Sequence, residues 1–321
     1  MFVFVFAFGG FMRIACRLVP RLAFAALLIA VASPAAFAQL PTATGRSIAM
    51  SDSHWKLFIP DEYVHSASID LVVHFHGDDA TFRNNVKWAN LNVVEVTVNY
   101  SGLSSAYQTP FLNTALFQNL LDDALAKVRA QTDFPDNINF RKVAVSSFSA
   151  GYGAVREILK QPTYFNRIDA LLAADSLYAS FTSDTDHTPL DSQMTNYRQY
   201  ATAAANGSKT FIFSHSQVPT FTYCETRECA DDLMAWVGAS PVADNSQGLG
   251  ELDFYRYADK GNFTVHGALG TDGDSHLEHL RYIGQFLQEL PLATVPEPTV
   301  GLLGAASMIQ LASRRRANVA R

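Results

Sequence analysis

The chain has 321 residues, of which 48% are hydrophobic and 17% are charged, and a formal net charge of −6. These proportions are typical of a globular protein with a sizeable core. Residues 1–38 and 295–321 hold seven arginines and one acid, so residues 39–294 carry 17 basic and 29 acidic side chains. A surface this acidic repels phosphate backbones, and we expect no nucleic-acid partner.

Residues 1–38 have the order of a secretory signal peptide. Three arginines precede an apolar run over residues 22–32, and Ala36-Phe37-Ala38 follows as an A-x-A cleavage site. The mature chain is therefore predicted to begin at Gln39. Met12 is an alternative start that gives the signal more ordinary proportions, and a retained membrane anchor is the alternative interpretation of the segment.

Between residues 39 and 294, apolar strands alternate with helical segments, and there is no repeat or linker. One domain over residues 39–294 is therefore expected. The predicted strands are 55–59, 70–75, 93–98, 142–145, 168–174, 210–213 and 263–269, and the predicted helices are 116–129, 152–160 and 277–290. Nearly continuous apolar strands separated by helices predict a mostly parallel central sheet with helices on both faces, an α/β class. Ligands of such sheets bind beyond the carboxyl ends of the strands, so the loops there are where chemistry is expected.

A serine motif lies between one predicted strand and the helix that follows it. Ser147-Phe148-Ser149-Ala150-Gly151 fits the G-x-S-x-G nucleophile elbow, except that Ser147 replaces the first glycine. The motif needs small residues because its central serine occupies a strained turn close to neighbouring strands. Ser149 is the predicted nucleophile, and a serine-rich helix cap is the alternative.

The chain around this serine resembles the α/β-hydrolase family. Residues 55–60, and residues 71–77 ending in His76-Gly77, look like the opening of secreted esterases of the feruloyl-esterase and polyester-depolymerase type. The resemblance implies the α/β-hydrolase fold and a serine hydrolase that cleaves a small-molecule or polymeric ester without a cofactor. It also implies an oxyanion hole built from the backbone N–H of Gly77 or Asp78 and that of Ala150. The aromatic-rich segments 178–207 and 219–236 are predicted to form the rim of the substrate pocket.

The resemblance places the catalytic histidine after the last strand, where His276 begins the final predicted helix. His279, one turn further on, is the fallback, and a surface histidine is the alternative interpretation of His276. Asp175 stands at the carboxyl end of strand 168–174 and is the predicted acid, which would orient the imidazole and stabilise its cation. The resulting order, Ser149, Asp175, His276, is that of the family. Weaker candidates for the acid are Glu225, Glu228 and Asp231.

Cys224 and Cys229 are the two cysteines that remain after the signal segment. An even pair in an oxidising compartment can form a disulfide. It cannot do so from within one regular helix, where side chains five residues apart point in different directions. Two buried thiols are the alternative.

Two other functions stay open on the sequence. The first of these functions depends on the segment His74-Phe75-His76-Gly77-Asp78-Asp79. Its H-x-H-x-D pattern resembles the first ligand cluster of metallo-β-lactamase-type hydrolases, which use zinc to activate water. Asp79 stands where those enzymes have histidine, and no metal is predicted. A surface or matrix binding protein that keeps the hydrolase fold without the chemistry is the other alternative.

The last 27 residues, 295–321, have three parts. Val295-Pro296-Glu297-Pro298 precedes an apolar run over residues 299–313 and three arginines at 314–316. The run is shorter than the roughly 20 residues that span a bilayer. This order resembles the PEP-CTERM sorting signal of Gram-negative bacteria that make exopolysaccharide. The resemblance implies a transient membrane anchor, an exosortase-like transpeptidase as partner, and delivery to the periplasm, cell surface or extracellular matrix. A tail anchor is the alternative.

Overall fold

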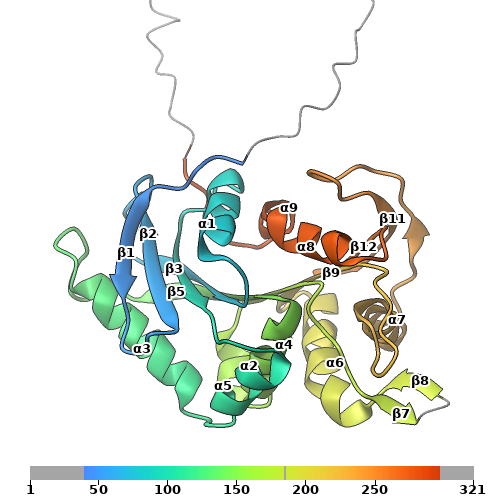
Figure 1. The fold of residues 1–321 in the computed structure, drawn as a ribbon. Helices are drawn as coiled ribbons and strands as arrows, with labels where there is room; N and C mark the ends of the chain where they lie inside the picture. The colour runs from blue at the N-terminus through green and yellow to red at the C-terminus, as the bar shows by residue number, and fades with distance from the viewer. Residues whose placement is uncertain (1–39, 184–185, 297–321) are drawn as a thin grey trace, which may run out of the picture. The chain divides into compact units, whose positions relative to one another are not determined.

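The computed structural model describes residues 40–183 and 186–296, whose centre is one long sheet (Figure 1). Its strands lie in the order β1-β2-β4-β3-β5-β6-β9-β12-β11-β10. The six strands from β4 to β12 in this order are parallel to one another, and the strands at both edges are antiparallel. The strands are β1 (Gly45–Ala49), β2 (Trp55–Pro60), β3 (Ile69–Phe75), β4 (Val93–Val98), β5 (Phe140–Phe148), β6 (Ala170–Ala174), β9 (Thr210–His215), β10 (Val242–Ala243), β11 (Phe254–Lys260) and β12 (Phe263–Ala268).

Helices cover both faces of this sheet (Figure 1). Helices α1 (Asp79–Trp88), α8 (Gly273–Arg281) and α9 (Gly284–Leu287) pack on one face. The other face carries α2 (Ser104–Phe111), α3 (Leu116–Arg129), α4 (Tyr152–Leu159), α5 (Pro162–Arg167), α6 (Asp191–Ala205) and α7 (Thr226–Val237). A small hairpin, β7 (Phe181–Ser183) and β8 (Asp186–Pro189), stands apart from the sheet. The mostly parallel sheet with helices on both faces is the predicted α/β-hydrolase fold.

The side chains of β3 show why the strand predictions succeed. Every residue of this strand is buried, with Leu71 and Val73 facing the core on one side of the sheet and Val72 facing the core on the other. A strand that contributes to two cores is expected to be apolar on both faces, and β3 follows this pattern except at the buried Asp70 and His74. By contrast, α6 was not predicted, because it buries Tyr197, Tyr200 and two alanines instead of an aliphatic stripe.

The prediction of one helix over residues 277–290 is wrong, because the chain breaks between α8 and α9. The side chain of Asn85, on α1, inserts at this break. Its Nδ2 donates to the carbonyl of Arg281 at 2.9 Å, and its Oδ1 accepts from the backbone N–H of Gly284 at 2.8 Å. The two backbone groups thus find a side-chain partner at the point where the helix ends.

Both terminal predictions fall mainly outside the described residues. The predicted signal segment, residues 1–38, lies wholly outside them, as does the predicted tail from residue 297 onward. The last described residues still contact the domain, since Thr294 pairs with Leu91 and Val295 donates to the carbonyl of Asn90. In the described part of the chain, no helix is both long and apolar enough to cross a membrane.

Glu95, in the middle of β4, is a buried acid. Its side chain belongs to a residue that is 1% exposed, and neither carboxylate oxygen has a hydrogen-bond partner among the described residues. Burial raises the pKa of Glu95 to about 8, although Arg83 nearby favours the charged form. Folding therefore keeps a proton on this side chain that the unfolded chain releases near its ordinary value of 4.5.

Glu95 therefore contributes less to stability as the pH rises. Between pH 4.5 and 8 the unfolded chain has lost the Glu95 proton and the folded protein retains it, so the contribution of Glu95 to the free energy of unfolding decreases by about 1.4 kcal/mol per pH unit. Glu95→Gln has the same shape and does not titrate. We expect it to match the wild type near pH 5 and to unfold at a higher temperature at pH 8. Thermal melts of both proteins over this range, with exposed Glu251→Gln as the control, measure the effect. Equal pH slopes for wild type and Glu95→Gln would contradict it.

Candidate active site

Ser149 occupies a strained turn between β5 and α4. Its φ is +47°, in the left-handed region, and residues Ser149–Gly151 form a short 3-10 turn before α4 begins. Such a backbone costs a non-glycine residue about 1–3 kcal/mol and persists chiefly at functional sites. Gly151 is required here, because an added Cβ would overlap the carbonyl of Phe75 on β3. Ser147, which replaces the usual first glycine, is buried in β5 beside Phe75 and Ala173, where a small side chain fits.

Asp175 and His276 are hydrogen-bonded to each other. The Oδ2 atom of Asp175 lies 2.7 Å from Nδ1 of His276, although the two residues are 101 positions apart. Asp175 follows β6 with a φ of +43° and is completely buried. Its carboxylate also accepts hydrogen bonds from the backbone N–H of Ser216 at 2.9 Å, from the Ser216 hydroxyl at 2.7 Å and from the Thr226 hydroxyl.

These contacts keep the carboxylate ionised. Burial alone would raise the pKa of Asp175, but the hydrogen bonds from His276 and Thr226 outweigh it and hold the pKa below its usual range. An ionised carboxylate only accepts hydrogen bonds, so the proton lies on Nδ1 of His276 and leaves Nε2 as the basic atom. The ring of His276 stacks on that of Phe148, the residue before Ser149, at 4.6 Å between centroids.

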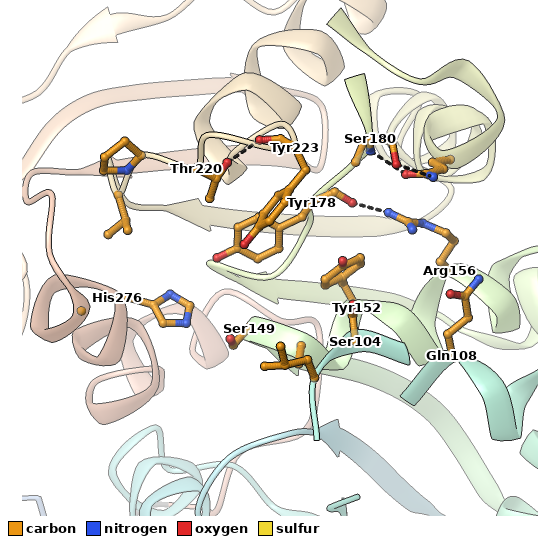
Figure 2. A pocket seen from close by; sticks show the side chains of 17 residues that line it. Ser104, Gln108, Ser149, Tyr152, Arg156, Tyr178, Ser180, Thr220, Tyr223 and His276 are labelled. Atoms are coloured by element: carbon orange, nitrogen blue, oxygen red, sulfur yellow. Dashed lines mark hydrogen bonds between the residues drawn. The ribbon is translucent and has the colours of Figure 1, made fainter. Parts of the chain in front are cut away.

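Ser149 and His276 open into one pocket of about 600 Å³ (Figure 2). Ala150 lines the same end of the pocket. Among the described residues no hydrogen bond joins the hydroxyl of Ser149 to His276; such bonds are often long without substrate and tighten when it binds. The pocket's other walls come partly from both predicted rim segments. Segment 178–207 contributes Tyr178, Ala179, Ser180 and Gln193, and segment 219–236 contributes Pro219, Thr220 and Tyr223. The remaining lining residues are Leu103, Ser104, Gln108, Tyr152, Arg156, Val218 and Gly273.

The predicted oxyanion donors are not all in the same position. Ala150 lines the pocket, whereas neither Gly77 nor Asp78 is among its lining residues. The N–H of Gly77 donates to Oδ1 of Asn99 at 3.0 Å, so this amide already has a partner. Asp78 is the exposed N-cap of α1, and its carboxylate accepts from the N–H of Thr81.

His279, the fallback base, lies in the core. It is completely buried, its Nδ1 is 2.9 Å from the hydroxyl of Ser214, and it does not line the pocket. Burial lowers its pKa to about 4, which keeps the ring neutral. One turn of α8 thus separates a histidine that faces the pocket from one that faces the sheet.

His74 and His76 point to opposite sides of the sheet. The ring of His74 stacks on Phe82 of α1 at 4.0 Å, while Nδ1 of His76 is 2.8 Å from the hydroxyl of Tyr107 on α2. The left-handed backbone of His76, with a φ of +72°, turns its side chain away from that of His74. Within residues 40–183 and 186–296, no three His, Cys, Asp or Glu side chains are grouped so that they could hold a metal ion. The metal interpretation of this motif therefore receives no support from the geometry.

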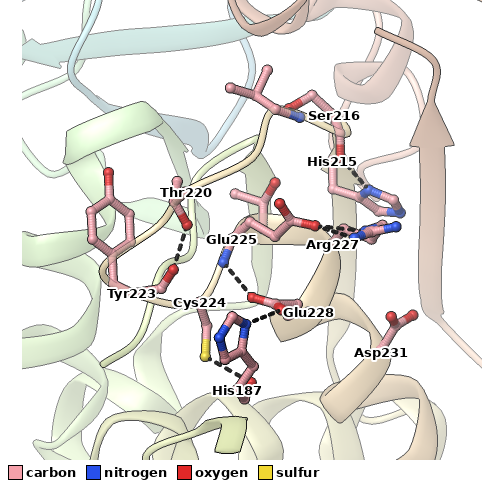
Figure 3. A network of polar contacts seen from close by, with 12 residues as sticks. His187, His215, Ser216, Thr220, Tyr223, Cys224, Glu225, Arg227, Glu228 and Asp231 are labelled. Carbon is pink, nitrogen blue, oxygen red and sulfur yellow. Dashed lines mark hydrogen bonds and ion pairs between the residues drawn. The ribbon is translucent and has the colours of Figure 1, made fainter. Parts of the chain in front are cut away.

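The weaker candidate acids have structural roles at the start of α7 (Figure 3). Glu225 and Glu228 form a reciprocal capping box, in which each side chain accepts from the backbone N–H of the other. Asp231, one turn along, pairs with Arg256 at 2.5 Å. None of the three is hydrogen-bonded to His276, whose partner is Asp175.

Cys224 and Cys229 are free, buried thiols, so the disulfide that their spacing allows is not formed. Cys229 lies inside α7 and faces the core, whereas Sγ of Cys224, before the helix, contacts the carbonyl of His187 at 3.2 Å (Figure 3). Both side chains pack in the same hydrophobic core. Burial raises the pKa of Cys224 to about 12, which keeps it protonated.

Three contributors to the site went unrecognised in the sequence. Ser216 and Thr226 hold the carboxylate of Asp175, and Arg156 forms part of the pocket wall. Ser216 follows β9 directly. The rule that functional residues lie in the loops after parallel strands therefore indicated its loop, but it did not show that Ser216 binds Asp175. Thr226 and Arg156 stand in helices, where a single polar residue has no distinguishing pattern.

Several solved esterase structures are similar to this chain at low identity. No family model and no curated protein matches the chain. A feruloyl esterase module from Clostridium thermocellum is 11% identical and covers 80% of this chain and 92% of its own, with a TM-score of 0.45. A truncated carbohydrate esterase from gut microbiota is 11% identical, covering 78% of this chain and 98% of its own, with a TM-score of 0.42. A thermophilic carboxylesterase from a metagenomic library is 11% identical and covers 78% of this chain and 87% of its own, with a TM-score of 0.38. The strand order and the mostly parallel sheet themselves identify the α/β-hydrolase fold of this chain.

Proposed function

We propose that the chain is a serine hydrolase that cleaves a carboxylic ester through an acyl-enzyme intermediate. Ser149 is the nucleophile, His276 the general base and Asp175 the acid that orients it. The observation that carries the proposal is the 2.7 Å bond from His276 to the buried Asp175, at the edge of a pocket that Ser149 also lines. The choice of an ester, instead of an amide, comes from the sequence resemblance.

In this mechanism Ser149 attacks the carbonyl carbon while Nε2 of His276 takes its proton. Asp175 stabilises the resulting imidazolium, and the N–H of Ala150 donates to the oxyanion. The tetrahedral intermediate expels the alcohol, which receives the proton from His276. Water then attacks the acyl-enzyme, again deprotonated by His276, and the carboxylic acid leaves with Ser149 restored. The second oxyanion donor is proposed at Gly77 or Asp78, of which the N–H of Gly77 is bonded to Asn99 and neither residue lines the pocket.

Aromatic rings in the pocket favour an apolar acyl or aryl group. Tyr152 and Tyr178 lie 5.4 Å apart between ring centroids, and Tyr178 and Tyr223 lie 5.6 Å apart. All three line the cavity next to Ser149 (Figure 2). Tyrosine pairs offer flat apolar faces together with hydroxyls that can donate hydrogen bonds. A ring or a flexible chain attached to the ester would fill this part of the pocket.

We also propose that the chain is exported and processed at both ends. The support is in the sequence: the signal-like segment 1–38, the domain over residues 39–294 and the sorting-like tail 295–321. An exosortase-like transpeptidase would act on this tail and deliver the domain to the periplasm, surface or matrix. Mass analysis of the protein from its own cells is expected to find Gln39 at the mature N-terminus. A protein that keeps residues 1–38 in the cytoplasm would overturn export.

A serine-reactive fluorophosphonate, with mapping of the labelled peptide, tests the proposed function. We expect label on Ser149 and turnover of short 4-nitrophenyl esters that a chelator does not change. Ser147→Ala is the matched control, because this serine lies two residues away in β5, is buried and has no partner for its hydroxyl within the described residues. The absence of both label and turnover would favour a binding protein, and turnover that a chelator abolishes would favour a metallohydrolase.

A further inference from the structure

Arg156 is a buried cation in the wall of the pocket. The residue is 8% exposed and stands on α4, seven positions after Ser149. One Nη2 donor bonds the carbonyl of Tyr178, and the guanidinium carbon lies 4.8 Å from the centroid of the Tyr152 ring. The Nε donor is buried without a partner. In the part of the chain that the structure describes, no acidic side chain forms an ion pair with Arg156.

A buried guanidinium without an anionic partner lowers the stability of the protein unless a bound ligand supplies that partner. Buried arginines are normally paired, because a charge removed from water must recover its lost hydration. Arg198 shows the ordinary solution in the same molecule. It is 9% exposed, and its guanidinium meets Asp191 at 2.6 Å and Asp232 at 2.5 Å. Arg156 has similar burial and lines the cavity, but in the described part of the chain its guanidinium meets no carboxylate.

The acid nearest to Arg156 in the sequence does not neutralise it. The carboxylate of Glu157 is taken by Nε2 of Gln108 at 2.8 Å and by Nζ of Lys160 at 2.7 Å. The other side chains at this end of the pocket are neutral, and two of them, Ser180 and Gln193, bond each other. This end of the cavity is therefore polar and positively charged.

We propose that Arg156 binds a carboxylate of the substrate, so that the enzyme acts on esters that carry a second, anionic group. This inference rests on the proposed function of Ser149. Ser149 and Arg156 are about two helical turns apart, or roughly 10 Å along the chain axis. The pocket between them is lined by Tyr152 and Tyr178 (Figure 2). The fitting ligand is an ester whose apolar ring or chain ends in a carboxylate, which the planar guanidinium can bind through paired N–H donors.

A matched pair of substrates tests this site. The first is a mono-4-nitrophenyl ester of a medium-length dicarboxylic acid, and in the second a primary amide replaces its free carboxylate. Charge-assisted hydrogen bonds predict that the wild type prefers the acid by about 10- to 100-fold in kcat/KM, mainly through KM. In Arg156→Gln the ratio of acid to amide is expected to fall to about one, and Arg156→Lys is expected to keep part of the preference. Arg46→Gln, on exposed β1, makes the same change in net charge and is expected to keep all of it.

The acid-to-amide ratio of kcat/KM distinguishes two roles of Arg156. If Arg156 binds an anion, its loss changes the ratio, whereas a purely structural role would affect both substrates alike. Equal kcat/KM for the two esters in the wild type, or a preference that survives Arg156→Gln, would overturn the inference. Binding of the same two compounds to Ser149→Ala, measured by calorimetry, tests the anion site without requiring turnover. Acid-selective binding that Arg156→Gln abolishes would support the anion site even if the protein proves not to be a hydrolase. Binding without selectivity, or no binding of the acid, would reject it.

Discussion

Ser149→Ala is expected to lower kcat for ester hydrolysis by about 10⁶-fold, the scale of loss when a triad nucleophile is removed. The alanine leaves the pocket and the Asp175–His276 pair in place but supplies no oxygen to attack the carbonyl. It keeps the same Cβ at a φ of +47°, so the backbone strain is not increased. Steady-state kinetics with a 4-nitrophenyl ester, together with a thermal melt to verify folding, measure the effect.

The control for this variant is Ser147→Ala in the same motif. Ser147 is fully buried and its hydroxyl lacks a partner within residues 40–183 and 186–296, so removing the oxygen is expected to leave turnover close to that of the wild type. A Ser149→Ala protein that retains most of its activity would reject the acyl-enzyme mechanism. A comparable loss in both variants would indicate damage to the turn instead of loss of the nucleophile.

Asp175→Asn is expected to lower kcat by about 10⁴-fold. Oδ2 of Asp175 accepts from both His276 and the Ser216 hydroxyl, and Oδ1 accepts from the Ser216 N–H and the Thr226 hydroxyl. An amide has only one accepting oxygen, so asparagine must place N–H groups against donors. If its nitrogen faces His276, the ring holds its proton on Nε2 and cannot take one from Ser149. If its oxygen does so, the uncharged amide no longer stabilises the imidazolium.

Kinetics of this variant need a test of folding beside them, because it also leaves buried donors unsatisfied, at a cost of about 1–3 kcal/mol. Circular dichroism at the assay temperature identifies the folded fraction. Asp231→Asn is the matched control: Asp231 is a candidate acid in the sequence, its side chain is 53% exposed and it pairs with Arg256 outside the pocket. Activity that survives Asp175→Asn but not Asp231→Asn would move the acid to α7.

The sequence by itself was enough to predict the architecture. Apolar strands such as β3 and β5, separated by helices, predict a parallel sheet because both faces of each strand are buried. The small residues around Ser149 predicted a strained turn between strand and helix, and the turn at Ser149 has this form. The rule that ligands bind after strands pointed to the loop of Asp175. The choice of His276 after the last strand came from the resemblance to the α/β-hydrolase family. Each of these signals is local, since it depends on the repeat of one element or on the residues that end it.

Only the tertiary structure decided which candidates meet. His276 and His279 are three residues apart in a polar helix, and the packing of α8 on the sheet sends one to Asp175 and the other to the core. The sequence likewise could not show that Asn99 takes the N–H of Gly77 or that no acid approaches Arg156 among the described residues. These outcomes depend on contacts between segments far apart in the chain, and local periodicity carries no information about them. Burial and the pairing of charges are properties of the folded molecule, so only the folded structure determines which candidate residues form the site.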